Sequence, residues 1–135
     1  MNAPQSIPSL IATVVALSIG AEFEGGKFAG ITTLPDGKHV AVVLLPDKPA
    51  KHLPWADAMA WATEAGGQLP ARPVAALLFA NLKAEFEEEW HWTNEPCSWA
   101  ESYACICHFD YGTQSHDHKG YYHAARAVRL IHLEV

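Results

Sequence analysis

Hydrophobic residues along this chain fall into short runs that predict both strands and helices. Phe28 to Leu34 and His39 to Leu45 are apolar runs rich in β-forming residues, and Pro35-Asp36-Gly37 separates them. Glycine supplies the positive φ that a tight turn needs, so these two runs are expected to form a hairpin. An earlier apolar run, Leu10 to Ile19, is too short to span a bilayer and lacks the preceding Lys or Arg of a signal peptide. It is interpreted as a core strand.

Two helices are expected in the middle of the chain. The first begins near Pro54 and has one apolar stripe at the spacing i, i+3, i+4, i+7, formed by Trp55, Ala58, Met59 and Ala62. Gly66-Gly67 should end it in a left-handed cap. The second covers about Val74 to Phe86 and turns four apolar side chains inward, namely Leu77, Leu78, Leu82 and Phe86.

Short strands and polar loops are expected from Trp90 onward. Residues 103 to 109 alternate between two faces, one with Tyr103, Cys105, Cys107 and Phe109 and the other with Ala104, Ile106 and His108. Strand alternation also predicts which large side chains are buried, namely Trp90, Trp92, Phe109 and Val128. The last strand, Ala124 to Leu133, is expected to pair with the N-terminal strand.

Size and charge narrow the range of functions. The chain has 135 residues, half of them hydrophobic, which is enough for one well-buried core. Residues 1–9, with two prolines, are therefore expected to be a flexible arm and residues 10–135 a single domain. The formal net charge is −6 at pH 7, and the densest charge run, Glu85 to Glu89, is acidic. Neither a nucleic acid nor a membrane is the expected partner.

Four motifs in the second half of the chain follow a distinctive order. They are Gly66-Gly67-Gln68-Leu69-Pro70-Ala71-Arg72, then Trp90-His91-Trp92-Thr93-Asn94-Glu95, then Tyr103 to Gly112, then Arg126-Ala127-Val128-Arg129. This order resembles the Lcl C-terminal-domain family, small proteins frequent in bacteriophages and prophages. The resemblance implies a C-type-lectin-like α+β fold, in which an antiparallel sheet carries two helices and the N- and C-terminal strands pair. It also implies a binding scaffold that is generally not an enzyme.

The segment from Glu95 to His123 is the richest in potential metal ligands, with three cysteines and four histidines. Cys105, Cys107, His108 and either His116 or His118 could in principle bind zinc. However, Cys105 and Cys107 are separated by one residue on an extended strand, whereas structural zinc sites usually use a turn with two intervening residues. The cysteines are therefore expected to be buried free thiols in a reducing compartment. No metal and no cofactor are expected.

Aromatic residues in the same segment are the expected recognition surface. Interfaces are enriched in rigid aromatic side chains among adaptable polar ones. The residues expected to bind a partner are Trp99, Tyr111, His116, His118, Tyr121 and Tyr122. A second group is expected to be structural, with the arginines bonding backbone carbonyls or a carboxylate; it comprises Leu69, Arg72, Trp92, Arg126 and Arg129.

These observations favour a non-catalytic protein-binding module of phage or prophage origin. Its small size, reduced cysteines and acidic surface point to an inhibitor of a host defence protein, of the anti-CRISPR kind, in the cytoplasm of a bacterial host. One alternative is a virion-associated protein that binds a receptor or glycan. Another is a metal-dependent enzyme that uses the Cys/His segment. The sequence leaves the partner and the oligomeric state open.

Overall fold

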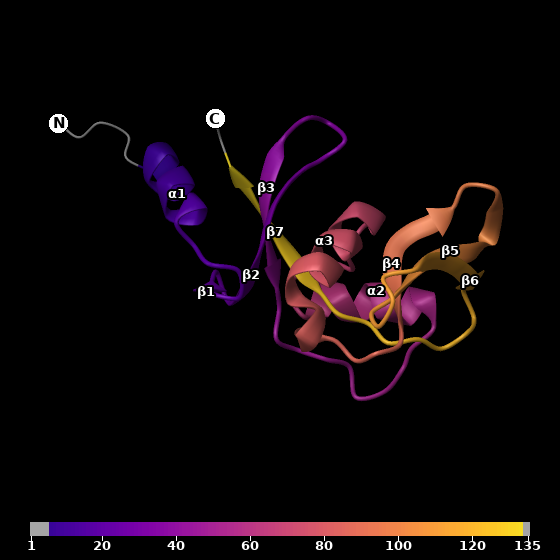
Figure 1. Cartoon of the computed structure of the whole chain (residues 1–135). Coiled ribbons are helices and arrows are strands. Elements are labelled where there is room, and N and C mark those ends of the chain that lie inside the picture. Colours follow the sequence, from indigo (N-terminus) through magenta and orange to yellow (C-terminus); the bar gives the residue numbers. More distant parts are fainter. Residues whose placement is uncertain (1–5, 134–135) are drawn as a thin grey trace.

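Two antiparallel sheets form the framework of the computed structural model, which describes residues 6–133 (Figure 1). The four-stranded sheet has the order β1-β2-β3-β7 and consists of Glu22–Phe23, Gly26–Thr33, His39–Leu44 and Val128–Leu133. The three-stranded sheet has the order β4-β5-β6 and consists of Trp90–Cys97, Ala100–His108 and Gln114–His118. The helices within these residues are α1 Ser6–Val15, α2 Trp55–Glu64 and α3 Arg72–Leu82, with a 3₁₀ turn, η1, at Lys83–Glu85. The expected α+β class is confirmed.

The expected hairpin and both central helices are present. Gly37 adopts a φ of 88° in the turn between β2 and β3, where its N–H donates to the carbonyl of Leu34 at 2.8 Å. Gly66, with a φ of 94°, follows α2 and caps it, as the sequence predicts. The helix α3 starts two residues before the expected Val74, and its last turn tightens into η1.

The interpretation of Leu10 to Ile19 as a strand is wrong. Most of this run belongs to α1, which begins at Ser6, and it contributes Val14 to a small core with Phe28, Ala41 and Leu133. A continuous apolar run has neither the strand period nor the helix period, so it does not distinguish the two. The expected boundary between an arm of residues 1–9 and the domain falls inside this helix, and residues 1–5 lie outside the described residues. None of the helices within residues 6–133 is long and apolar enough to cross a membrane.

The expected pairing of the N- and C-terminal strands is also wrong. The last strand, β7, is shorter than expected and pairs with β3, from His39 opposite Leu133 to Leu44 opposite Val128. The N-terminal element is a helix, so it offers no strand edge, and α1 contacts β7 through side chains instead.

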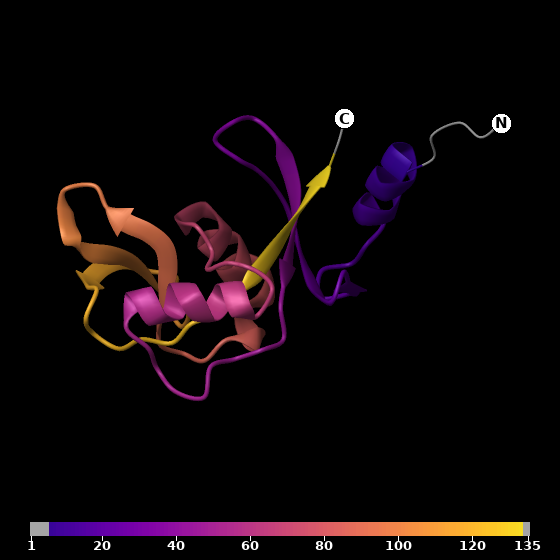
Figure 2. The same ribbon diagram turned by 180° about the vertical axis from the view of Figure 1, so that it is seen from behind.

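The two sheets are held together by helices on their faces. In Figures 1 and 2, α1 lies on one side of the four-stranded sheet, and α3 lies between that sheet and the three-stranded one. Leu78 of α3 joins Val42 of β3 and Cys107 of β5 in one core. On the opposite face of the three-stranded sheet, Ala62 of α2 joins Trp92 of β4 in a second core. Both faces of β5 are therefore buried near its C-terminal end.

The corner that follows α2 is expected to be a stability element. Gln68 forms a backbone bridge with Val128 at the start of β7, and Leu69 beside it is fully buried. Replacing Leu69 with alanine should lower the free energy of unfolding by about 2 to 4 kcal/mol, because it leaves a cavity in the core. Chemical denaturation measures this change. Val15→Ala, at a position 67% exposed, is the control and should change it by less than about 0.5 kcal/mol. Equal effects of the two substitutions would contradict the assignment.

Candidate functional site

Exposed aromatic side chains are concentrated between Cys97 and Tyr122. Four large side chains in this segment are more than half exposed: Trp99 at 66%, Tyr111 at 74%, Tyr121 at 60% and Tyr122 at 62%. Their exposure confirms the sequence prediction, as does the burial of Trp92, Phe109 and Val128. Trp90 differs from its prediction, because it is only partly buried at the rim of the second core.

Trp99 and Tyr121 are the two ends of a continuous row of rings that we call the aromatic ridge: Trp99, His116, Tyr103, His118 and Tyr121. Successive ring centroids are 4.8, 5.8, 5.7 and 5.8 Å apart along this row. Aromatic rings attract one another at such separations, so each ring restrains its neighbours. A surface whose rings are already ordered loses little side-chain entropy when a partner binds.

Strand register explains why these rings share a face. Tyr103 lies opposite His118 and Cys105 lies opposite His116 across the β5–β6 ladder. Paired residues, and residues two apart on one strand, project from the same face of a sheet. Trp99 follows β4 in the tight turn into β5, which brings its ring over His116.

The turn after β6 is fixed by short polar contacts. The Asp117 carboxylate accepts from the His118 N–H at 2.8 Å and lies 2.7 Å from His123 Nε2. The Gly120 N–H donates to His118 Nδ1 at 3.0 Å. These contacts set the orientation of the His118 ring and thereby the end of the ridge that carries Tyr121.

The six residues expected to bind a partner do not form one surface. Trp99, His116, His118 and Tyr121 lie on the ridge, whereas Tyr111 follows the other end of β5 and its ring contacts His108 at 5.1 Å. A nine-residue strand separates the two ends of β5 by about 30 Å. Tyr122 is exposed beside Tyr121 but makes no ring contact among the residues that the structure describes.

A hollow of about 350 Å³ lies beside the ridge at the N-terminus of α3. Trp99 and His116 line it together with Arg72 and Glu95. Arg72 Nε donates to the side-chain carbonyl of Gln114 at 3.0 Å, and the Arg72 backbone N–H donates to the Glu95 carboxylate at 2.8 Å. Arg72 thus links α3 to both β4 and β6, the structural role expected from the sequence, and it gives the ridge a polar border.

The three cysteines are free and buried, as the sequence predicts. Burial and the neighbouring Cys97 raise the pKa of the Cys105 thiol, and burial raises the pKa of Cys107. Thiols with raised pKa values stay protonated at neutral pH and are poor nucleophiles. The thiols therefore give no support to an activated cysteine nucleophile in this segment.

Arg126 and Arg129 bond backbone carbonyls, in agreement with their expected structural role. The two Nη atoms of Arg126 donate to the carbonyls of Glu85 and Leu45, and Arg129 donates to the carbonyl of Glu24 at 2.8 Å. Arg126 is only 6% exposed, and burial lowers the pKa of its guanidinium.

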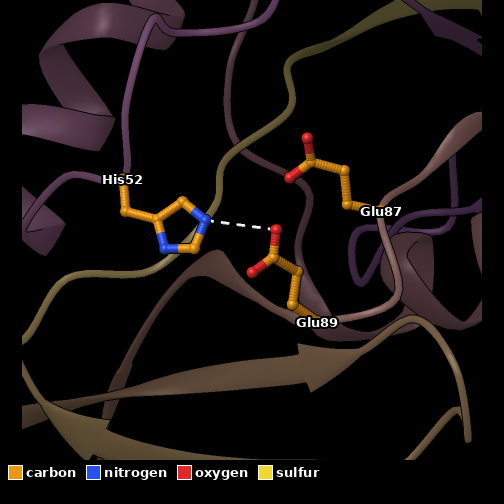
Figure 3. A group of neighbouring side chains, drawn as sticks. All are labelled: His52, Glu87 and Glu89. Atoms are coloured by element: carbon orange, nitrogen blue, oxygen red, sulfur yellow. Dashed lines mark ion pairs between the residues drawn. The ribbon is translucent and has the colours of Figure 1, made fainter.

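A second cavity, of about 320 Å³, lies away from the ridge and was not predicted from the sequence. His52, from the loop before α2, faces Glu87 and Glu89 from the loop before β4 (Figure 3). The buried residues His91 and Arg126 also line this cavity, as do Lys48 and Lys51 on the loop that carries His52. Charged groups of both signs therefore meet around this cavity.

Glu87 and Glu89 are close enough to influence each other's ionisation. A hydrogen bond between the two carboxyl groups, together with burial and the charge of Glu89, raises the pKa of Glu87. The same hydrogen bond lowers the pKa of Glu89, and His52 lowers it further. Two carboxylates held this close favour a shared proton or a bound cation between them.

No protein-family model matches this chain, and no curated protein matches it either. The resemblance to the Lcl C-terminal-domain family stays a prediction that rests on the four sequence motifs. The same is true of the C-type-lectin-like fold.

Sequence reasoning missed Tyr103 on the ridge, and it missed the group of His52, Glu87 and Glu89 at the second cavity. Tyr103 carried a usable signal, because it begins the alternation of β5 and lies at its less buried end. The acidic run that contains Glu87 and Glu89 was visible in the sequence, but nothing indicated that the distant His52 would meet it, because the two loops come together only in the folded chain.

Proposed function

We propose that this chain is a non-catalytic protein-binding module and that the aromatic ridge is its recognition surface. The observation that carries the proposal is the continuity of the ridge, in which exposed rings at both ends are joined by ring contacts. When a partner buries them, large aromatic side chains contribute most of the binding energy in many protein complexes.

The surroundings of the ridge suit a protein partner. The hollow beside it adds a guanidinium and a carboxylate to the apolar rings, and interfaces combine such polar groups with an aromatic centre. The ridge also lies at the far end of the molecule from α1, on a sheet that both helices α2 and α3 support (Figures 1 and 2). A partner can approach this end without displacing the core.

The kind of partner follows from the resemblance and from the charge of the chain. A small acidic protein of phage or prophage origin is suited to inhibit a host defence protein in the bacterial cytoplasm. A glycan or receptor bound by a virion-associated protein is the second candidate, because an exposed tryptophan borders a polar hollow. The first proposal requires a protein ligand, and the second requires a carbohydrate.

Alanine at Trp99 or at Tyr121 should each weaken partner binding about tenfold or more, because loss of a central aromatic anchor costs ~2 kcal/mol. A pull-down from bacterial host lysate identifies the partner, and calorimetry with the purified pair measures the affinity. Tyr111→Ala is the matched control: it removes an equally exposed ring at the other end of β5 and should leave the affinity unchanged.

Two results would contradict this assignment. The first is full affinity in Trp99→Ala and Tyr121→Ala with loss on reversing the charges of Glu87, Glu88 and Glu89, which would move the interface to the acidic loop. The second is binding to a defined glycan that Trp99→Ala abolishes while no protein is captured, which would favour the carbohydrate proposal.

A further inference from the structure

His52, Glu87 and Glu89 bring one imidazole and two carboxylates together at the mouth of the second cavity. One potential ligand atom from each residue lies within 4.8 Å of the others, and this is the one such group of three among residues 6–133. His52 Nε2 is 3.2 Å from a Glu89 carboxylate oxygen, as the dashed line in Figure 3 marks. The side chains of His52 and Glu89 are 43% and 38% exposed, so an ion can reach them from solvent.

The backbone holds both sides of this group in place. The Glu89 N–H donates to the Glu87 carbonyl at 2.9 Å, which keeps the two glutamates in one tight turn. The Glu89 carbonyl in turn accepts from the Phe109 N–H at 3.1 Å. On the other side, Leu53 exchanges two backbone hydrogen bonds with His123, of 3.0 and 3.1 Å, directly after His52. The backbone on both sides of the group is therefore held by hydrogen bonds, and its three ligand atoms already lie within 4.8 Å of one another.

A second observation concerns the wall of the cavity beside this group. Arg126 is 6% exposed and lines the cavity, and its Nε has no hydrogen-bond acceptor among the described residues. An unsatisfied buried donor is costly and is rare in native proteins. Because both Nη groups are occupied by backbone carbonyls, Nε is left as a buried donor without an acceptor in the wall of this cavity.

We propose that His52, Glu87 and Glu89 bind a divalent transition-metal ion, with Zn²⁺ as the best match. Imidazole nitrogen and carboxylate oxygen are zinc ligands, and three protein ligands leave a fourth tetrahedral position open. In a tetrahedral zinc site, ligand atoms are about 3.3 Å apart. The three atoms here lie within 4.8 Å of one another, so their separations must shorten by ~1.5 Å at most to bind the ion. Arg126 and Lys48 line the same cavity, and their positive charges favour a carboxylate or phosphate as the further ligand. This proposal is independent of the aromatic ridge.

The experiment titrates the tag-free full-length chain, stripped with a chelator, with Zn²⁺ by calorimetry and with Co²⁺ by absorption spectroscopy. One ion per chain is expected, and the Co²⁺ spectrum should lack the charge-transfer band of a thiolate ligand. His52→Ala and Glu89→Gln should each weaken binding at least about tenfold, the smallest effect typical of residues that support a metal site.

Glu88→Gln is the matched control, since it removes the same charge from the neighbouring exposed residue of the same loop, and it should change the affinity by less than about twofold. Glu87→Gln is the second test variant, and circular dichroism checks that each variant is folded. The proposal is overturned if the wild-type chain binds no stoichiometric ion or if His52→Ala binds as tightly as wild type. It is also overturned if a thiolate band appears or if His116→Ala, rather than His52→Ala, abolishes binding.

Discussion

Replacing Trp92 with alanine is expected to lower the free energy of unfolding by about 3 to 5 kcal/mol. Trp92 is fully buried between α2 and the three-stranded sheet, and its Nε1–H donates to the Leu53 carbonyl at 2.7 Å. The substitution leaves a large cavity and removes this hydrogen bond. Small domains are stable by about 5 to 15 kcal/mol, so the loss is a large share of the total. Thermal and urea unfolding followed by circular dichroism measure it.

Trp99→Ala is the control for this experiment. It removes the same side chain from a position that is 66% exposed, and it should change the free energy of unfolding by less than about 0.5 kcal/mol. Trp92→Phe keeps most of the volume but not the donor, so it separates the hydrogen bond from the cavity. If Trp92→Ala and Trp99→Ala destabilise the protein equally, the assignment of Trp92 to the core and of Trp99 to the surface is wrong.

The stability of the protein should fall as the pH is lowered from about 6.5 to about 4, with His91 as a main cause. His91 is 3% exposed, and its ring contacts the rings of Phe86 and Phe109. Burial, and after it the charge of Arg126, lowers the pKa of His91 from 6.5 to about 4, while its hydrogen bond to the Glu89 carbonyl opposes the shift. The neutral form is therefore the one that the folded state favours.

The sign of the effect follows from this depressed pKa. Above pH 6.5 the histidine is neutral in both states and its full contribution to stability is present. Below pH 6.5 the unfolded chain binds a proton that the folded chain does not, and the contribution is lost as the pH approaches 4. A shift from 6.5 to about 4 corresponds to up to ~3 kcal/mol.

The measurement is the free energy of unfolding at several pH values between 4 and 7, made in the presence of a chelator. His91→Gln cannot take up this proton, so its stability should depend less steeply on pH than that of wild type. Other groups titrate in the same range, and comparing the two proteins removes their contribution. Parallel pH profiles would show that His91 keeps an ordinary pKa in the folded state.

Local sequence signals were sufficient wherever one short segment determines its own structure. The β2–β3 hairpin follows from Pro35-Asp36-Gly37, and α2 follows from its apolar stripe and from Gly66, which alone fits the positive φ at the cap. The exposure of Trp99, Tyr111, Tyr121 and Tyr122 was likewise predictable, because they lie in a segment that lacks a helical period and mixes aromatic with polar residues.

Local sequence signals did not predict the structure of segments whose surroundings come from distant parts of the chain. Leu10 to Ile19 is mostly apolar, so its hydrophobicity fits either a helix or a strand. In the folded protein, the helix packs Val14 against Phe28 and Ala41. The partner of β7 is equally non-local. Once the N-terminal element is a helix, β3 is the strand that pairs along the whole of β7.

The sequence by itself determined the α+β class, the hairpin, the two central helices and the set of exposed aromatic side chains, because these depend on residue spacing and local polarity. Only the tertiary structure decided which of those aromatics touch. The β5–β6 register joins Tyr103 to His118, and the length of β5 separates Tyr111 from Trp99. The tertiary structure alone brought His52 to Glu89. Contacts between distant loops depend on the core that both loops flank, so no local pattern in the sequence indicates them.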